Sequence, residues 1–67
     1  MTQRERILNY IDEHGSITPM EAWSELGITK LATRVSELRR DGEKIDKRYV
    51  TTTNRYGEKV TYMEYRR

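Results

Sequence analysis

The chain has 67 residues, of which 34% are hydrophobic and 36% charged, and it carries a formal net charge of +2 with one histidine and no cysteine. A chain this short builds one small core, which excludes a second domain and leaves few side chains to form a deep substrate cavity. The missing cysteines exclude disulfides and thiolate zinc sites, and no apolar run approaches the roughly 18 residues of a membrane span, so we expect a cytoplasmic protein with no metal, cofactor or membrane contact.

The first predicted element is a helix over about residues 2–14. Ile7 and Ile11 recur at helical spacing and give one apolar stripe, with charged residues on the other faces. Thr2 is followed three positions later by a glutamate, which is the pattern of a capping box. Gly15 then supplies the left-handed residue that ends the helix.

A second, shorter helix is predicted over about residues 19–26. Thr18 is its expected N-cap and Pro19 occupies the first helical position, where its missing N–H has no intrahelical partner. Gly27 ends this helix after only two turns. Residues 16–17, between the two helices, are long enough only for a minimal strand at a sheet edge.

The third predicted helix covers about residues 29–41, with Thr29 as its expected N-cap. Leu31, Val35 and Leu38 fall at i, i+4 and i+7 and form its buried stripe. This helix begins only two residues after Gly27, the glycine that ends the second helix. The two helices must therefore cross steeply, as in a helix-turn-helix unit.

After the third helix the pattern changes to that of a β-hairpin. Two segments rich in β-branched and aromatic residues, about 44–52 and 58–65, flank the turn residues 54–57. Pairing them about that turn predicts that Tyr49 lies opposite Tyr62, as an aromatic pair. The side chains expected to pack on the helices are Ile45, Tyr49, Val60 and Tyr62.

These elements predict one α+β domain over residues 1–67: a winged helix-turn-helix fold in which three helices precede a two-stranded antiparallel wing. The stretch from Ile17 to Gly42 reads ITPMEA, then LGITKLATRVSELRRDG after three intervening residues. This stretch resembles a small winged helix-turn-helix family common in bacteriophage and prophage genomes. The resemblance implies a recognition helix over residues 29–40 and a wing tip over 51–59. Because the chain ends shortly after the second wing strand, we expect no appended dimerisation helix.

The distribution of charge also favours DNA binding. Residues 1–28 have a net charge of −3, residues 29–48 of +3 and residues 49–67 of +2. This separation is typical of a protein with one basic face, although a solvated surface of mixed charge is the simpler interpretation.

We therefore expect sequence-selective binding of double-stranded DNA, with the recognition helix in the major groove. The residues expected to contact bases are Thr29, Lys30, Thr33, Arg34 and Glu37. The residues expected to contact phosphates are Arg40, Lys44 and Arg48. The residues expected to reach DNA from the wing are Asn54, Arg55, Tyr56 and Lys59.

Several of these residues have a purely structural alternative. Arg34 and Glu37 are three positions apart and can form a surface ion pair that contacts nothing else. Trp23 is expected to fill the core or its edge rather than to bind a ligand. These alternatives stay open at the level of sequence.

The implied biological role is a small phage-type transcriptional regulator or recombination accessory factor, bound as a homodimer or as a cooperative assembly on DNA. The rival is a winged-helix module that docks on a host protein through its acidic first half and binds no DNA. An enzyme is not expected, because the chain offers no Cys–His pair, no Ser–His–Asp candidate and no phosphate-binding glycine loop. We also expect no small-molecule ligand.

Overall fold

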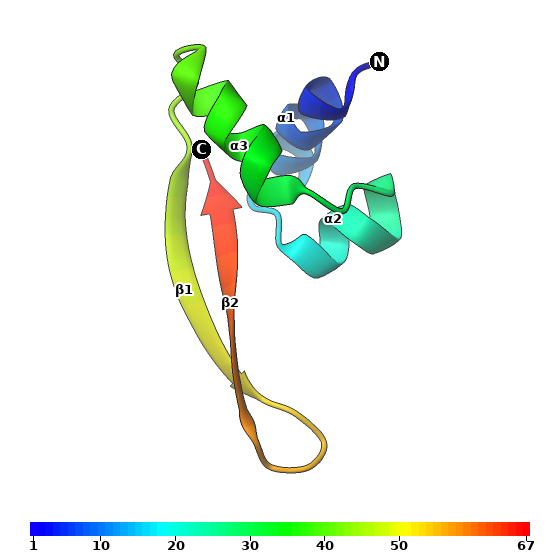
Figure 1. Ribbon diagram of the computed structural model, residues 1–67, viewed down its shortest axis with the longest axis vertical. Helices are drawn as coiled ribbons and strands as arrows, with labels where there is room; N and C mark the ends of the chain where they lie inside the picture. The colour runs from blue at the N-terminus through cyan, green and yellow to red at the C-terminus, as the bar shows by residue number, and fades with distance from the viewer.

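A computed structural model describes residues 1–67, in which three helices precede two antiparallel strands. The elements are α1 (Gln3–His14), α2 (Pro19–Leu26), α3 (Leu31–Arg40), β1 (Asp46–Thr53) and β2 (Lys59–Arg66). The helices gather at one end and the hairpin projects from them, which gives the molecule extents of 39 × 21 × 20 Å (Figure 1). None of the helices is long and apolar enough to cross a membrane. The predicted α+β winged helix-turn-helix arrangement is confirmed.

The first two helices begin at the predicted threonine caps. In α1, Thr2 Oγ1 accepts a hydrogen bond from the Glu5 amide at 3.1 Å, and the Thr2 amide donates to the Glu5 carboxylate at 3.1 Å. The bond from the Thr2 amide to the ionised carboxylate is the main cause that lowers the pKa of Glu5. Both helices end at a glycine with positive φ, 90° at Gly15 and 68° at Gly27, where a residue with a Cβ would be strained.

The cap of α2 also joins it to α1. One oxygen of the Glu21 carboxylate accepts from the Thr18 amide at 3.0 Å, and the other accepts from the Tyr10 hydroxyl at 3.0 Å. Partial removal from water raises the pKa of Tyr10, and so does the bond to Glu21. One side chain therefore completes a helix cap and fixes the position of that helix against its neighbour.

The helix-turn-helix unit is closed by burial of the turn itself. Ile28 is buried and its amide donates to the carbonyl of Ala22 at 2.9 Å, while Ala22 has no side chain beyond Cβ to hold the helices apart. The prediction that Thr29 caps α3 is wrong, because Lys30 is the N-cap and makes no side-chain cap bond. The physical reason is the burial of both Ile28 and Leu31, which places the exposed Thr29 in the bend between them.

The hairpin is attached to the helices through the predicted short strand at residues 16–17. Ile17 and Tyr65 form an antiparallel bridge, in which the Ile17 amide donates to the Tyr65 carbonyl at 2.8 Å and the Tyr65 amide donates to the Ile17 carbonyl at 2.9 Å. Both residues are buried. The linker between α1 and α2 thus pairs with β2 along the edge that does not face β1.

The predicted strand register is wrong by one residue. Tyr49 lies opposite Met63, and Tyr62 lies opposite Val50. The cause is the turn, in which the Asn54 amide donates to the Glu58 carbonyl at 2.9 Å and Gly57 adopts a φ of 77°. This closure leaves an odd number of residues in the loop, as in a three-residue hairpin with a left-handed glycine, whereas the prediction assumed an even number.

A slip of one residue moves the side chains of one strand to the other face of the hairpin. The predicted packing face is therefore only half right. Ile45 is buried as expected, but Val60 and Tyr62 lie on the opposite face, where Val60 is 40% exposed and Tyr62 is half-buried. Tyr49 does share the face of Ile45, but it lies farther along the hairpin and is 74% exposed. Tyr65 is buried in their place, because it lies on the same face as Ile45 and at the end of the hairpin nearest the helices.

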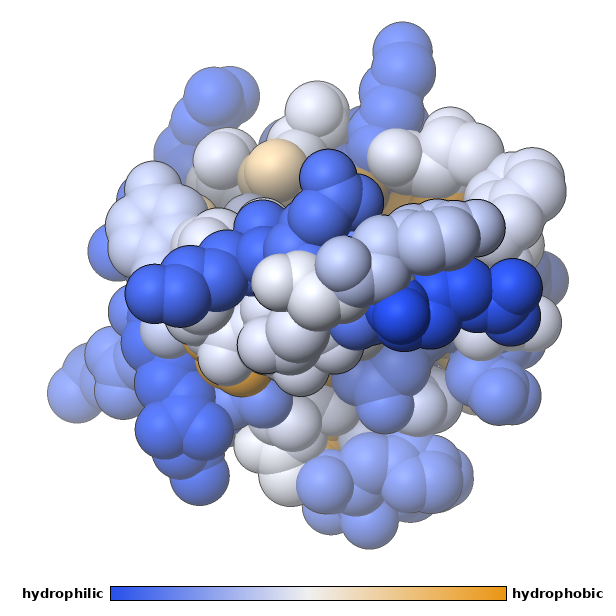
Figure 2. Space-filling model, turned by 90° about the horizontal axis from the view of Figure 1, so that it is seen from below, coloured by the Kyte–Doolittle hydropathy of each residue, from blue (hydrophilic) through white to orange (hydrophobic).

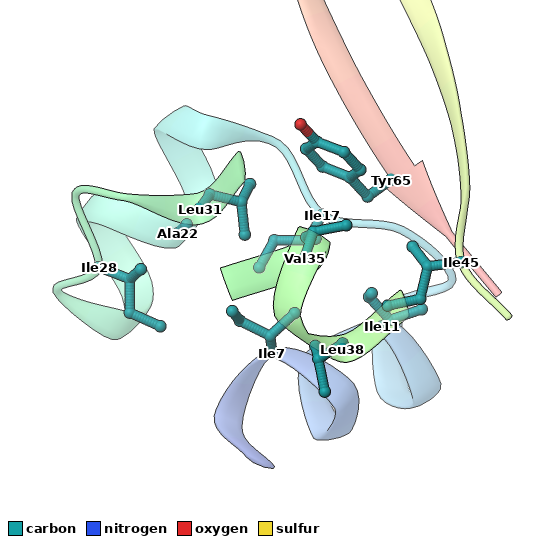
Figure 3. Packing of buried hydrophobic residues seen from close by; sticks show 10 residues of the cluster. All are labelled: Ile7, Ile11, Ile17, Ala22, Ile28, Leu31, Val35, Leu38, Ile45 and Tyr65. Carbon is teal, nitrogen blue, oxygen red and sulfur yellow. The ribbon is translucent and has the colours of Figure 1, made fainter. Parts of the chain in front are cut away.

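The core is made of side chains from the three helices, from β2 and from the linkers, whereas β1 contributes none (Figure 3). Its ten members are Ile7, Ile11, Ile17, Ala22, Ile28, Leu31, Val35, Leu38, Ile45 and Tyr65. No buried side-chain polar atom lacks a hydrogen bond. Trp23 is not part of this cluster, and the expectation that it fills the core is wrong, since it is 59% exposed on the outer side of α2.

We predict that Thr18→Ala destabilises the protein by about 1 kcal/mol, because it removes the cap acceptor from α2. Thr29→Ala is the matched control, since Thr29 is an exposed threonine that caps nothing in the structure. It should change the free energy of unfolding by less than about 0.5 kcal/mol. Urea denaturation followed by circular dichroism measures both changes. Equal losses in the two variants would contradict the structure at these positions.

We predict that stability falls in alkaline solution, in part because of Tyr65. Burial raises the pKa of its hydroxyl above the ordinary value of 10.0, and the nearby Tyr49 adds to the increase. The folded protein favours the neutral hydroxyl over the ionised one. The contribution of Tyr65 to folding stability is therefore fully present below pH 10.0 and is lost as the pH rises through the raised pKa. Thermal unfolding measured from pH 8 to about 11 should therefore show a steeper decline for the wild type than for Tyr65→Phe. Parallel declines would show that Tyr65 does not titrate with unfolding.

Candidate nucleic-acid interface

The exposed side of α3 carries polar side chains. Leu31, Val35 and Leu38 occupy the buried side of the helix. Because successive helical residues are turned by about 100°, Thr33 and Ser36 lie on the opposite side, and both are exposed. Neither side chain forms a hydrogen bond within the protein, so both hydroxyls are available to a ligand.

One flank of α3 faces α1. Arg34 Nε donates to Gln3 Oε1 at 3.0 Å, and its Nη1 donates to both carboxylate oxygens of Glu37 at 2.9 Å. The side chains of Arg34 and Glu37 are 32% and 34% exposed. At the end of this flank, Arg4 of α1 forms an ion pair with Asp41 at 2.8 Å.

The other flank of α3 faces the hairpin. Val35 and Leu38 of α3 belong to the same buried cluster as Ile45, which precedes β1, and Tyr65 of β2. The C-terminal part of α3 therefore lies next to the face of the hairpin that carries Ile45 and Tyr65.

Ion pairs divide the basic residues into two groups. Four of the 13 Lys and Arg side chains lie within 4.0 Å of a carboxylate, namely Arg4, Arg34, Arg48 and Arg67. The others have no such partner, and only Arg6 among them belongs to α1 or α2. The rest lie on α3 or after it: Lys30, Arg39, Arg40, Lys44, Lys47, Arg55, Lys59 and Arg66. Apart from Arg6, the uncompensated positive charge is thus located at the start of α3, on α3, in the segment that follows it and on the hairpin.

The two faces of the hairpin differ in charge because of the register. Lys47, Tyr49 and Lys59 share the face that continues from Ile45, and this face carries no acidic residue. The opposite face contains the ion pair of Arg48 with Glu64, whose Nε and Oε1 atoms are 2.8 Å apart. The positive face is the one that borders α3.

The wing tip is a rigid turn rather than a loose loop. Asn54 Oδ1 accepts from the amides of Tyr56 and Glu58 at 2.9 and 3.1 Å. These bonds leave the side chains of Arg55 and Tyr56 exposed at the tip, and Tyr56 is 76% exposed. Seen from the tip, the near surface is hydrophilic or intermediate, with hydrophobic residues visible only in small areas (Figure 2).

The structure separates the twelve predicted contact residues into two sets. Four of them have partners within the protein: Arg34, Glu37, Arg48 and Asn54. The others are exposed and their side chains form no hydrogen bond within the protein: Thr29, Lys30, Thr33, Arg40, Lys44, Arg55, Tyr56 and Lys59. DNA contact by any of them stays a prediction.

Three residues of this surface were not predicted, namely Ser36, Lys47 and Tyr49. Ser36 is recognisable from helical spacing alone, because it lies opposite the stripe of Leu31 and Val35. Lys47 and Tyr49 follow Ile45 at alternate positions and share its face, but their exposure depends on how far along the hairpin the helices reach, which the sequence does not show. No group of three or more His, Asp or Glu side chains is placed to hold a metal ion.

A short helix, a buried turn, a second helix with an exposed side and an attached antiparallel hairpin together define a winged helix-turn-helix protein. The chain belongs to the winged helix-turn-helix domain family, whose model matches residues 2–66. Domains of this family are in general DNA-binding units without catalytic function. No curated protein and no solved structure matches the chain.

We predict that Asn54→Ala loosens the wing tip without unfolding the protein, because it removes two hydrogen bonds of an exposed turn. Hydrogen–deuterium exchange of the Tyr56 and Glu58 amides should accelerate, while amides of α1 and α3 stay protected. Asn54→Asp keeps the acceptor oxygen and is the matched control. Unchanged exchange at the tip in the alanine variant would contradict the bonding of this turn.

Proposed function

We propose that the protein binds double-stranded DNA selectively, with α3 in the major groove and the hairpin against the adjoining backbone. The observation that carries this proposal is the concentration of unpaired cations on α3, the segments next to it and the hairpin, with Arg6 as the one exception. Carboxylates without a lysine or arginine partner are concentrated instead on α1 and α2, where Glu13, Glu21 and Glu25 lie. A polyanion is therefore attracted to one side of the molecule and repelled from the other.

Base contacts are proposed for the N-terminal half of α3 and the turn before it. Lys30 is exposed at the first position and can donate to guanine O6 and N7. Thr33 offers a methyl group to thymine and a hydroxyl to a base edge, and Thr29 precedes them in the turn. Contacts by Arg34 and Glu37 would require that their ion pair opens.

Phosphate contacts are proposed for the cations that surround this helix. Arg40 ends α3 and Lys44 follows in the segment before β1, so both can lie along one strand of the duplex. On the wing, Arg55 and Lys59 can reach the neighbouring backbone or minor groove, with Asn54 and Tyr56 beside them. Arg48 is the weakest candidate, because Glu64 already neutralises it.

As a biological role we propose a small regulator of transcription or of recombination, acting on bacterial or phage DNA. A chain of 67 residues offers a limited contact area, which favours cooperative binding of several copies to neighbouring sites. The resemblance to phage and prophage domains described above supports this role.

A second candidate function is protein binding without DNA. It is favoured by one observation, the exposure of Met20 and Trp23 to 74% and 59% on α2. Met20 lines a groove between the start of α2 and β2, where Val60 and Tyr62 form the other wall. Apolar side chains exposed together in this way are typical of a docking surface.

The test is a titration of labelled duplex DNA at several salt concentrations. The logarithm of the binding constant should fall linearly with the logarithm of the salt concentration, with a slope of about −0.9 for each phosphate neutralised. Lys44→Gln and Lys59→Gln should each make that slope less steep by about 0.9 and weaken binding to all sequences alike.

Arg6→Gln is the matched control, because it removes an unpaired cation from α1, outside the proposed surface. It should leave both the affinity and the slope close to the wild-type values. If the folded protein binds no duplex even at low salt, the proposal fails and protein binding becomes the favoured function.

A further inference from the structure

The sequence places Arg34 and Glu37 together with Thr33 as residues that read DNA bases, but the structure gives them different surroundings. Arg34 and Glu37 lie on the flank of α3 that faces α1, in contact with each other. Thr33 and Ser36 lie on the open side, with no partner in the protein. The two pairs are therefore suited to different tasks.

We propose that Thr33 and Ser36 determine base preference, and that Arg34 and Glu37 are positioning residues that hold α3 at its angle to α1. The inference rests on the proposed DNA binding and adds which side chains read the sequence. It names Ser36 as a specificity-determining residue and takes base reading away from Arg34.

The positioning role follows from the geometry of Arg34. Its guanidinium is held at two edges, by Gln3 Oε1 at 3.0 Å and by both oxygens of Glu37 at 2.9 Å. Gln3 is the first residue of α1, so this network joins the start of one helix to the middle of the other. Bonds in which a donor or acceptor is charged are the stronger ones in proteins, and an arginine held at two positions has one orientation.

Base reading by Arg34 would destroy this network. The guanidinium would leave Glu37, whose carboxylate would then face the phosphates of the duplex without a counterion. That arrangement replaces an attraction by a repulsion next to a polyanion. The intact ion pair of Arg34 and Glu37 is therefore compatible with DNA bound to α3, whereas opening the pair disfavours DNA binding.

The reading role follows from the position of Thr33 and Ser36. They are three residues apart, which places them side by side on a helix, and they lie opposite the buried Val35 and Leu38. Both are short, so the helix backbone can approach the groove floor closely. A threonine methyl packs on thymine, and a serine hydroxyl can donate to or accept from any base edge.

The experiment is a charge swap. Arg34→Glu combined with Glu37→Arg keeps the net charge and can restore the ion pair, and the Gln3 amide can donate to the new glutamate. Each single variant places two like charges three residues apart and should lower the melting temperature. The double variant should recover most of that loss. It should also select the same base sequence as the wild type from a randomised duplex library.

Thr33→Ala and Ser36→Ala should instead keep the wild-type melting temperature. Each should lower selectivity at one or two base positions, with discrimination reduced by about tenfold. Thr52→Ala, an exposed threonine on the outer face of the hairpin, is the matched control and should change neither property.

The outcomes separate the two proposals. A swapped variant that folds but selects another sequence, or Thr33 and Ser36 variants with unchanged preference, would overturn the assignment while leaving DNA binding intact. Absence of DNA binding in the wild type would overturn the proposed function and the reading role together. The recovery of melting temperature in the swapped variant decides the positioning role in either case.

Discussion

The arrangement of the whole molecule depends on the paired backbones of Ile17 and Tyr65. Two hydrogen bonds join these residues, and both side chains are buried in the core. An isolated two-stranded hairpin is marginally stable in water, so this hairpin needs the attachment. The same bridge determines which face of the hairpin is directed towards α3. Without it the cations of the hairpin would have no fixed relation to those of the helix.

The division of charge follows from this arrangement. Acidic residues that neutralise arginines lie mainly where helices and strands meet: Asp41 beside Arg4, and Asp12 and Glu43 beside Arg67. These exposed pairs add little stability individually, because water screens them. Their larger effect is on the surface potential, since they remove the negative charges of α3 and its neighbours from competition with a polyanion.

Much of the helical part could be predicted from residues close together in the sequence. The threonine caps, the proline at the start of α2 and the left-handed glycines act through bonds to residues three or four positions away. The stripe of Leu31, Val35 and Leu38 likewise requires only helical geometry. The prediction failed where competition between distant contacts decided the result, as at Thr29, where burial of Ile28 and Leu31 moved the start of α3.

The candidate site was predicted less completely than the fold. Exposure of Lys30, Thr33 and the wing-tip residues agrees with the sequence pattern, because polar residues opposite an apolar stripe face water. The partners of Arg34 could not be foreseen in full. Glu37 is a local neighbour, but Gln3 is 31 positions away and meets Arg34 only because α1 packs on α3.

What the sequence by itself determined are the elements, their order and the side of each helix that is buried, since these depend on local hydrogen bonds and hydropathy. Only the tertiary structure decided which face of each strand packs on the helices and which partner each charged side chain has. The hairpin shows the reason most directly. A single residue in the turn, Gly57 with positive φ, shifts the register by one position. That shift exchanges the two faces of one strand relative to the other, so Tyr65, and not Tyr62, shares the packing face with Ile45 and enters the core.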